Sequence, residues 1–160
     1  MAFFDMYDCT TREGVIAVLN ALYASERIAA EQYYRHSVDV TGIWSSSLSE
    51  VFAEHAEEEN GHADALRDLI DNLGGTITNK LSTMVRINPH HSGDGDVQAS
   101  LDTRTILEQD LEAEMTAIEA YTEAASLVHM QWPHVYIALA GILADEYHHQ
   151  RELRNLLASG

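Results

Sequence analysis

The sequence lacks the residues that several classes of protein depend on. Cys9 is the only cysteine among 160 residues, so neither an internal disulfide nor a cysteine-rich metal site can form. Lysine and arginine number 9 against 26 acidic residues, and a formal net charge of −17 has the wrong sign for binding nucleic acid or anionic membranes. The longest apolar run, residues 135–144, is far short of the ~18 residues of a membrane span. We expect no nucleic-acid partner, no membrane segment and a cytoplasmic location, and any metal site must use histidines and carboxylates.

What the sequence does contain is helical periodicity in four long stretches. Apolar residues recur at intervals of three and four, which predicts helices over about residues 11–40, 48–73, 102–130 and 133–157. Residues 74–101 are rich in Gly, Ser, Thr, Asn and Asp and are expected to be an irregular connection that runs the height of the molecule. The prediction is one all-α domain, residues 1–160, folded as a four-helix bundle with a long crossover between the second and third helices.

The starts of these helices carry recognisable capping signals. Thr10 with Glu13, and Ser47 with Glu50, have the spacing of capping boxes. An aspartate and a proline are suited to open the third and fourth helices, namely Asp102 and Pro133.

Acidic residues and histidines on the apolar faces of these helices form a candidate metal site. Glu59 and His62 are three residues apart on the second helix, and Glu146 and His149 repeat this spacing on the fourth. Glu26 and Glu114 lie near the middle of the remaining two helices. The midpoints of four long bundled helices lie at one height, so we expect these six side chains to converge. Four buried glutamates would repel one another strongly unless cations or protons neutralised them, and the donor set suits two divalent ions.

Each of these residues also has a purely structural interpretation. Glu26 and Glu114 could face solvent, and each histidine could be a core residue paired with a neighbouring acid. Glu58 lies four residues before His62 and could replace Glu59 as the metal-facing acid. Tyr33 and Tyr121 could be core aromatics or could donate hydrogen bonds or electrons at the site. Four further histidines are expected at the surface or beside the ligands: His55, His129, His134 and His148.

Four segments resemble the helix signatures of the ferritin superfamily, most closely its bacterioferritin and Dps-like branch. They are SERIAAEQYYRH (residues 25–36), ENGHAD (residues 59–64), DLEAE (residues 110–114) and DEYHH (residues 145–149). The resemblance covers about residues 15–157 and implies a ferritin-like bundle with two irons per subunit. By this resemblance Glu59 and Glu146 would bridge the irons, Glu26 with His62 and Glu114 with His149 would complete the two positions, and Tyr33 would lie beside them. Glu54 and Glu58 fall where bacterioferritins keep an inner-surface iron site.

Two departures from the bacterioferritin pattern bear on cofactor and assembly. Asn60 stands where bacterioferritins place a haem-ligating methionine, so haem is not expected at that site. Only 11 residues follow His149, too few for the short fifth helix associated with shells of 24 subunits. We therefore expect a homo-oligomer of 12 subunits, as in Dps-like mini-ferritins, rather than 24.

The resemblance implies a ferroxidase that stores iron. It would oxidise Fe(II) with dioxygen or hydrogen peroxide and deposit Fe(III) inside a hollow shell. One alternative is a diiron peroxidase or oxidase of rubrerythrin type that stores nothing; those sites usually carry a further carboxylate on the third helix, and Leu111 and Ala117 stand three residues either side of Glu114. A second alternative is a structural four-helix module whose acidic cluster binds no metal.

Overall fold

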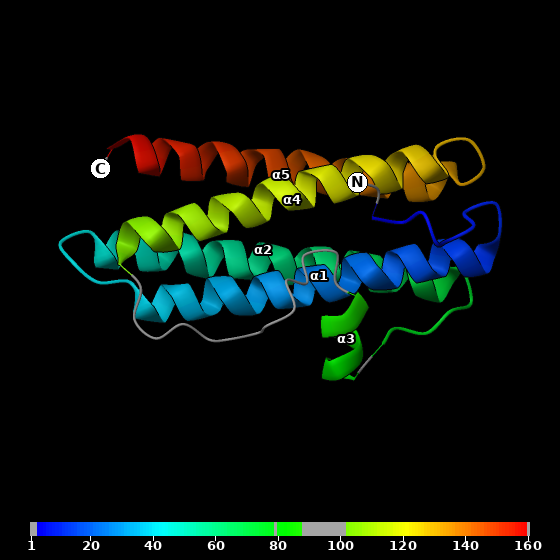
Figure 1. The fold of residues 1–160 in the computed structure, drawn as a ribbon, viewed down its shortest axis with the longest axis horizontal. Helices are drawn as coiled ribbons and strands as arrows, with labels where there is room; N and C mark the ends of the chain where they lie inside the picture. The colour runs from blue at the N-terminus through cyan, green and yellow to red at the C-terminus, as the bar shows by residue number, and fades with distance from the viewer. Residues whose placement is uncertain (1–2, 79, 88–101, 160) are drawn as a thin grey trace.

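Four long helices make up most of the protein (Figure 1). The computed structural model describes residues 3–78, 80–87 and 102–159. The elements are α1 (Arg12–Asp39), α2 (Ser45–Asn72), the short α3 (Leu81–Ile87), α4 (Thr103–Val128) and α5 (Pro133–Ser159). The long helices lie alongside one another, which confirms the expected all-α four-helix bundle.

The bundle consists of two helical hairpins. α1 packs along α2 and α4 along α5, and the hairpins meet through α1 with α4 and α2 with α5. α4 begins at the opposite end of the bundle from the end of α2, so α4 runs parallel to α2, as expected (Figure 1). The crossover is not wholly irregular, however, because α3 forms within it and lies against α1. Residues 88–101 of the expected crossover fall outside the described residues.

Two of the expected helix caps are wrong. Thr11, not Thr10, caps α1: its hydroxyl oxygen accepts a hydrogen bond from the Gly14 N–H at 3.1 Å, while the Thr10 hydroxyl donates to Asp8. α2 begins at Ser45, two residues before the expected cap Ser47, and the residue at its N-cap position makes no side-chain capping bond. The earlier start follows from the tight turn at Gly42, whose φ of 98° favours glycine and whose carbonyl accepts from the Ser45 N–H. Asp102 caps α4 as expected, accepting from the Thr105 N–H at 2.8 Å.

The apolar interior is divided into two clusters along the bundle. The larger cluster joins the first half of α1, the second half of α2 and the α4–α5 turn region, with Leu19, Leu66 and Leu139 fully buried. The smaller cluster lies towards the other end, around Phe52 and Leu153. Buried polar residues lie between these two clusters along the helices, so apolar packing encloses them from both ends of the bundle.

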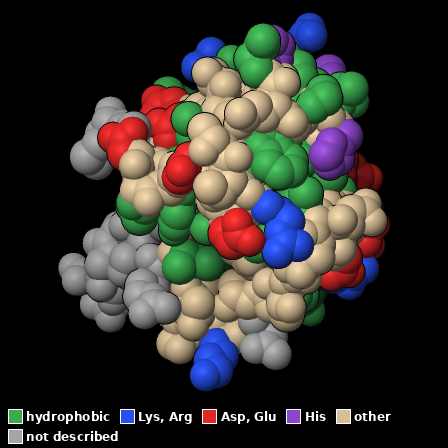
Figure 2. Space-filling model, turned by 90° about the vertical axis from the view of Figure 1, so that its right-hand side faces the viewer, with side chains coloured by type: hydrophobic (Ala, Val, Ile, Leu, Met, Phe, Trp, Pro, Cys, Tyr) green, Lys and Arg blue, Asp and Glu red, His purple; other side chains and the backbone are tan. Residues whose placement is uncertain are grey.

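The N-terminal segment is fastened across one end of the bundle, the end seen in Figure 2. The Phe3 and Phe4 N–H groups donate to the Glu123 carboxylate at 3.1 and 2.7 Å, and the Phe4 ring is buried. Trp132 Nε1–H donates to the Cys9 carbonyl at 2.9 Å. On this face hydrophobic side chains lie among scattered charges of both signs (Figure 2). Within the described residues, no helix has the length and apolar composition needed to cross a membrane.

Candidate metal centre

The structure brings all six expected side chains together in the interior. Each of the four helices of the bundle supplies one glutamate, and α2 and α5 supply a histidine each, three residues after their glutamate. All six are buried, with exposures of 7% or less: Glu26, Glu59, His62, Glu114, Glu146 and His149. The solvent-facing interpretation of Glu26 and Glu114 is therefore wrong. Glu59 is 1% exposed whereas the Glu58 side chain is half-exposed, which settles which of the two acids faces the interior.

The six residues form two overlapping groups of four. In each group one oxygen or nitrogen per residue lies within 4.8 Å of the others, as the ligands of one ion do. The first group is Glu26, Glu59, His62 and Glu146, and the second is Glu59, Glu114, Glu146 and His149. Glu59 and Glu146 belong to both, so each could bridge two neighbouring ions.

Each imidazole turns Nδ1 towards three carboxylates. His62 Nδ1 lies 3.0 Å from Glu146, 3.4 Å from Glu59 and 3.7 Å from Glu26. His149 Nδ1 lies 2.8 Å from Glu59, 3.1 Å from Glu114 and 4.0 Å from Glu146. A single ring nitrogen cannot hydrogen-bond to three carboxylates at once, whereas a cation among them would contact them all.

The outer nitrogen of each imidazole faces a further carboxylate. His62 Nε2 lies 2.9 Å from Asp145, and His149 Nε2 lies 2.5 Å from Glu58. A metal-bound histidine commonly donates its second ring N–H to a carboxylate in this way, which fixes the ring and its tautomer. In the sequence, Glu58 and Asp145 each directly precede one of the shared glutamates. Only the pairing of α2 with α5, however, brings each of them to the histidine of the opposite helix.

Two tyrosines hold the outer glutamates across the bundle. The Tyr33 hydroxyl on α1 donates to Glu114 Oε1 on α4, and the Tyr121 hydroxyl on α4 donates to Glu26 Oε1 on α1. Burial, together with the charge of the neighbouring glutamate, raises the pKa of both phenols well above its usual value. Both remain protonated at neutral pH and therefore act as hydrogen-bond donors.

Burial sets the protonation of the cluster when no cation is present. Burial, and then repulsion from a second carboxylate, raises the pKa of Glu26 and of Glu146 well above the usual value. Burial alone would lower the pKa of His149, but its contacts with Glu114 and Glu59 raise the pKa to about 12; the pKa of His62 is raised for the same reason. The metal-free cluster is thus neutralised by protons, and cations would have to displace them.

Several buried oxygens of the cluster lack a hydrogen bond, as expected of metal ligands. Among the described residues, Glu59 Oε1, Glu114 Oε2 and Glu146 Oε1 have no partner of acceptable hydrogen-bond geometry. Leaving such atoms unsatisfied costs about 1–3 kcal/mol each, and more for a charged group. Oxygen-rich ligation with two imidazoles and no thiolate fits Fe(II) and similar divalent ions, so the residues present fit a pair of such ions.

A small cavity between α1 and α4 reaches this cluster. Its volume is about 50 Å³, enough for a water molecule or a diatomic oxidant. The cluster glutamates form part of its wall. The rest of the wall is mostly small or apolar, with Gln32 as a polar member, and consists of Ser25, Ile28, Ala29, Gln32, Tyr33, Ala113 and Ala117.

Other expectations had mixed outcomes. Glu54 is exposed and belongs to neither group of four. His129, His134 and His148 are exposed, and His55 is buried beside the cluster, stacked on the His149 ring, so both expected environments occur. A buried pair next to the cluster was not expected from the sequence. The two carboxylate oxygens of Asp110, one turn before Glu114, lie 2.8 and 2.9 Å from His36 Nδ1, and Asp110 also accepts a hydrogen bond from Gln32.

Solved structures of related proteins share this architecture. At 27% identity, the dodecameric thioferritin of Bacteroides fragilis, a bacterioferritin-related protein, superposes with a TM-score of 0.85 over 93% of this chain and 87% of that chain. Also at 27% identity, a ferritin-like diiron-carboxylate protein of Bacillus anthracis gives 0.76 over 91% and 96%. An archaeal Dps homologue of Halobacterium salinarum, at 24% identity, shares the fold with 0.83 over 91% and 80%.

The sequence itself identifies the family. No curated protein sequence matches the chain. The model of the ferritin-like domain, however, matches residues 16–160, which include most of α1, all of the other three bundle helices and the six clustered residues. The chain therefore belongs to the ferritin-like domain family.

Proposed function

We propose that this protein is a ferroxidase that binds two Fe(II) ions as substrate, oxidises them together and stores the Fe(III) produced. The observation that carries the proposal is the overlap of two four-residue ligand groups at Glu59 and Glu146. Two shared carboxylates hold two ions close enough to give up two electrons in one event.

The oxidation balances with either oxidant. Two Fe(II) become two Fe(III) and release two electrons, which reduce dioxygen with two protons to hydrogen peroxide, or reduce hydrogen peroxide with two protons to two waters. The cavity between α1 and α4 gives a small oxidant access to the pair. The protein holds the ions at a fixed separation, excludes bulk water by burial and orients the imidazoles through Asp145 and Glu58.

Storage requires a hollow assembly, which we propose is a homo-oligomer of twelve subunits. The dodecameric thioferritin of Bacteroides fragilis supports this number. Several large apolar side chains are exposed on the single chain and are available for contacts between subunits. The most exposed of them are Met6, Tyr34, Val38, Ile43, Trp44, Met130 and Ile137.

One experiment tests oxidation and storage together. Fe(II) is added anaerobically to metal-free protein, oxygen is then admitted, and near-ultraviolet absorbance and iron retained per assembly after gel filtration are recorded. We expect a fast phase at two Fe(II) per chain and retention of iron well beyond that ratio. Glu59→Gln and Glu146→Gln should each slow the fast phase at least tenfold, whereas Glu57→Gln, an exposed neighbour on α2, should not. An unchanged rate in both cluster variants would contradict the proposal.

The same experiment separates storage from the rubrerythrin-type alternative, which oxidises without retaining iron. A rubrerythrin-type site would need a further carboxylate on α4. Asp110 is buried one turn from Glu114, but His36 and Gln32 hold it through hydrogen bonds. It is therefore engaged elsewhere and does not supply a further ligand to the pair.

A further inference from the structure

His55 has the same arrangement as the two histidines of the cluster. Its Nε2 lies 3.0 Å from the half-exposed Glu152 carboxylate on α5, just as His62 Nε2 faces Asp145 and His149 Nε2 faces Glu58. A carboxylate accepts hydrogen bonds only, so it keeps a proton on Nε2 and leaves a lone pair on Nδ1. This is the usual preparation of a histidine for metal binding through its other nitrogen.

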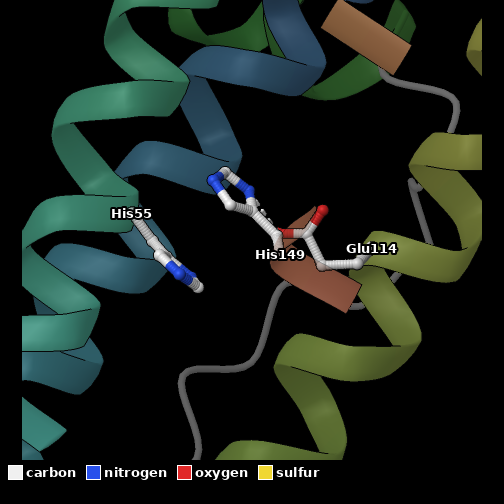
Figure 3. A group of neighbouring side chains, drawn as sticks. All are labelled: His55, Glu114 and His149. Carbon is white, nitrogen blue, oxygen red and sulfur yellow. Dashed lines mark hydrogen bonds and ion pairs between the residues drawn. The ribbon is translucent and has the colours of Figure 1, made fainter. Parts of the chain in front are cut away.

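Two buried atoms beside this ring have nothing to bind. His55 is 2% exposed, and within the part of the chain that the structure describes its Nδ1 has no hydrogen-bond partner. The same holds for Glu114 Oε2, the second oxygen of a glutamate whose Oε1 already meets Tyr33 and His149. His55, Glu114 and His149 converge from α2, α4 and α5 and have ligand atoms within 4.8 Å of one another (Figure 3).

The ring geometry places His55 next to a different ion from that of His149. The two rings stack, with centroids 4.2 Å apart and planes at 22°. Nearly parallel rings direct their in-plane lone pairs side by side rather than at one point, so they serve adjacent ions.

Charge at this side of the cluster allows for another cation. Four buried glutamates balance two divalent ions. Glu58 and Glu152, which contact His149 and His55, add two further formal negative charges, the charge of one more divalent ion. Both carboxylates are half-exposed and link this side of the cluster to solvent.

The corresponding place on the other side of the cluster is apolar. The two hairpins repeat one pattern: Glu26 with Tyr33 and Glu114 with Tyr121 are each seven residues apart, and the glutamate–histidine pairs of α2 and α5 share one spacing. His55 is four residues before Glu59, and the residue four before Glu146 is Ile142, which packs in the larger apolar cluster. The two halves of the cluster are therefore inequivalent.

We propose that His55 Nδ1 and Glu114 Oε2 bind a third divalent cation, beside the His149 position only, with Glu58 and Glu152 supplying the balancing charge. The proposal rests on the proposed function, because it shares Glu114 with the ion pair. Imidazole with carboxylate selects Fe(II), Co(II) or Zn(II) over Mg(II) or Ca(II). The position lies beside the pair, where His55, Glu114 and His149 converge from α2, α4 and α5.

Metal counting without oxidation tests this site. Anaerobic Co(II) titration by calorimetry, and crystals grown with Co(II) and measured at the cobalt absorption edge, report stoichiometry and position independently of activity. We expect three ions per chain in the unaltered protein and two in His55→Phe, which keeps a ring against His149 but has no Nδ1. His134→Phe, the same change at an exposed histidine, should leave three. Should His55→Phe fail to fold, as judged by circular dichroism, His55→Gln replaces it with the same expectation.

Each outcome decides the matter. Two ions in the unaltered protein, or three in the His55 variant, would overturn the third site while leaving the proposed ferroxidase intact. A His55 variant that folds yet binds fewer than two ions would mean that the ring only supports the pair, and this too would overturn the site. Fewer than two ions in the unaltered protein would instead overturn the proposed function.

Discussion

The Tyr121 hydroxyl reaches across the bundle from α4 and donates a hydrogen bond to Glu26 on α1. The same contact recurs in reverse between Tyr33 and Glu114, so each hairpin fixes a glutamate of the other. Because a phenol binds one oxygen of each glutamate, it fixes the orientation of that carboxylate within the cluster. The tyrosines thus couple the packing of the hairpins to the geometry of the site.

Tyr121→Phe removes this donor and adds no bulk. Glu26 would then be buried with one fewer hydrogen bond, which we expect to lower the free energy of unfolding of the metal-free protein by about 1–3 kcal/mol. Loss of an orienting contact to a ligand should weaken Co(II) binding about 10–100-fold. Urea denaturation and calorimetry measure the two effects. Tyr34→Phe, at an exposed tyrosine of α1, should change neither, and a Tyr121 variant that behaved like it would refute the orienting role.

Metal binding should release protons and tighten as pH rises. The pKa of Glu26 and of Glu146 is raised by burial, and contacts with carboxylates raise the pKa of His149 to about 12, so these groups hold protons in the metal-free protein near neutral pH. Ligands bind metal in their deprotonated form, so cations must expel the protons. Co(II) calorimetry at pH 7 in two buffers of different ionisation enthalpy counts them. Equal heats in both buffers, with an affinity that does not change between about pH 6 and 8, would contradict this account.

The sequence predicts the convergence of the six side chains well, for a physical reason. Spacing of three and four residues fixes which side chains share a helix face, and a four-helix bundle aligns the helix midpoints. Glu59, His62, Glu146 and His149 were therefore placed together by local periodicity and fold class alone, and the structure agrees. Their role as ligands stays a prediction.

What the sequence did not predict depends on contacts between distant segments. Asp110 is fully buried because His36, 74 residues away, faces it, and nothing near Asp110 in the sequence indicates that partner. His55 is buried because α5 brings His149 and Glu152 against it. Thr11 rather than the expected Thr10 caps α1, because the Thr10 hydroxyl donates to Asp8 instead. The capping-box spacing does not account for such a competing local hydrogen bond.

Glu146→Gln should stabilise the metal-free protein increasingly as pH rises. A buried carboxyl whose folded pKa is raised binds more protons in the folded than in the unfolded state, so its contribution to stability declines as pH rises above the unfolded value of 4.5. Glutamine does not titrate, so the difference in unfolding free energy between variant and parent should grow from pH 5 to pH 8 in the presence of a chelator. Urea denaturation at several pH values measures it. Exposed Glu119→Gln is the control, and a difference independent of pH would count against a raised pKa.

Two glycines on the long helices should respond oppositely to alanine. At Gly14 an added Cβ would lie 1.8 Å from the carbonyl oxygen of Asp8, in the turn that leads into α1. Because that neighbour is backbone, we expect Gly14→Ala to lower the unfolding free energy by about 1–3 kcal/mol or more. At Gly61, exposed within α2, an added Cβ would meet nothing within 4 Å in the described chain. Gly61→Ala should therefore raise the unfolding free energy by about 0.5–1 kcal/mol, because alanine has the higher helix propensity. Thermal and urea denaturation compare the two. If both substitutions stabilised the protein, the close approach of the Asp8 carbonyl oxygen to Gly14 would be wrong.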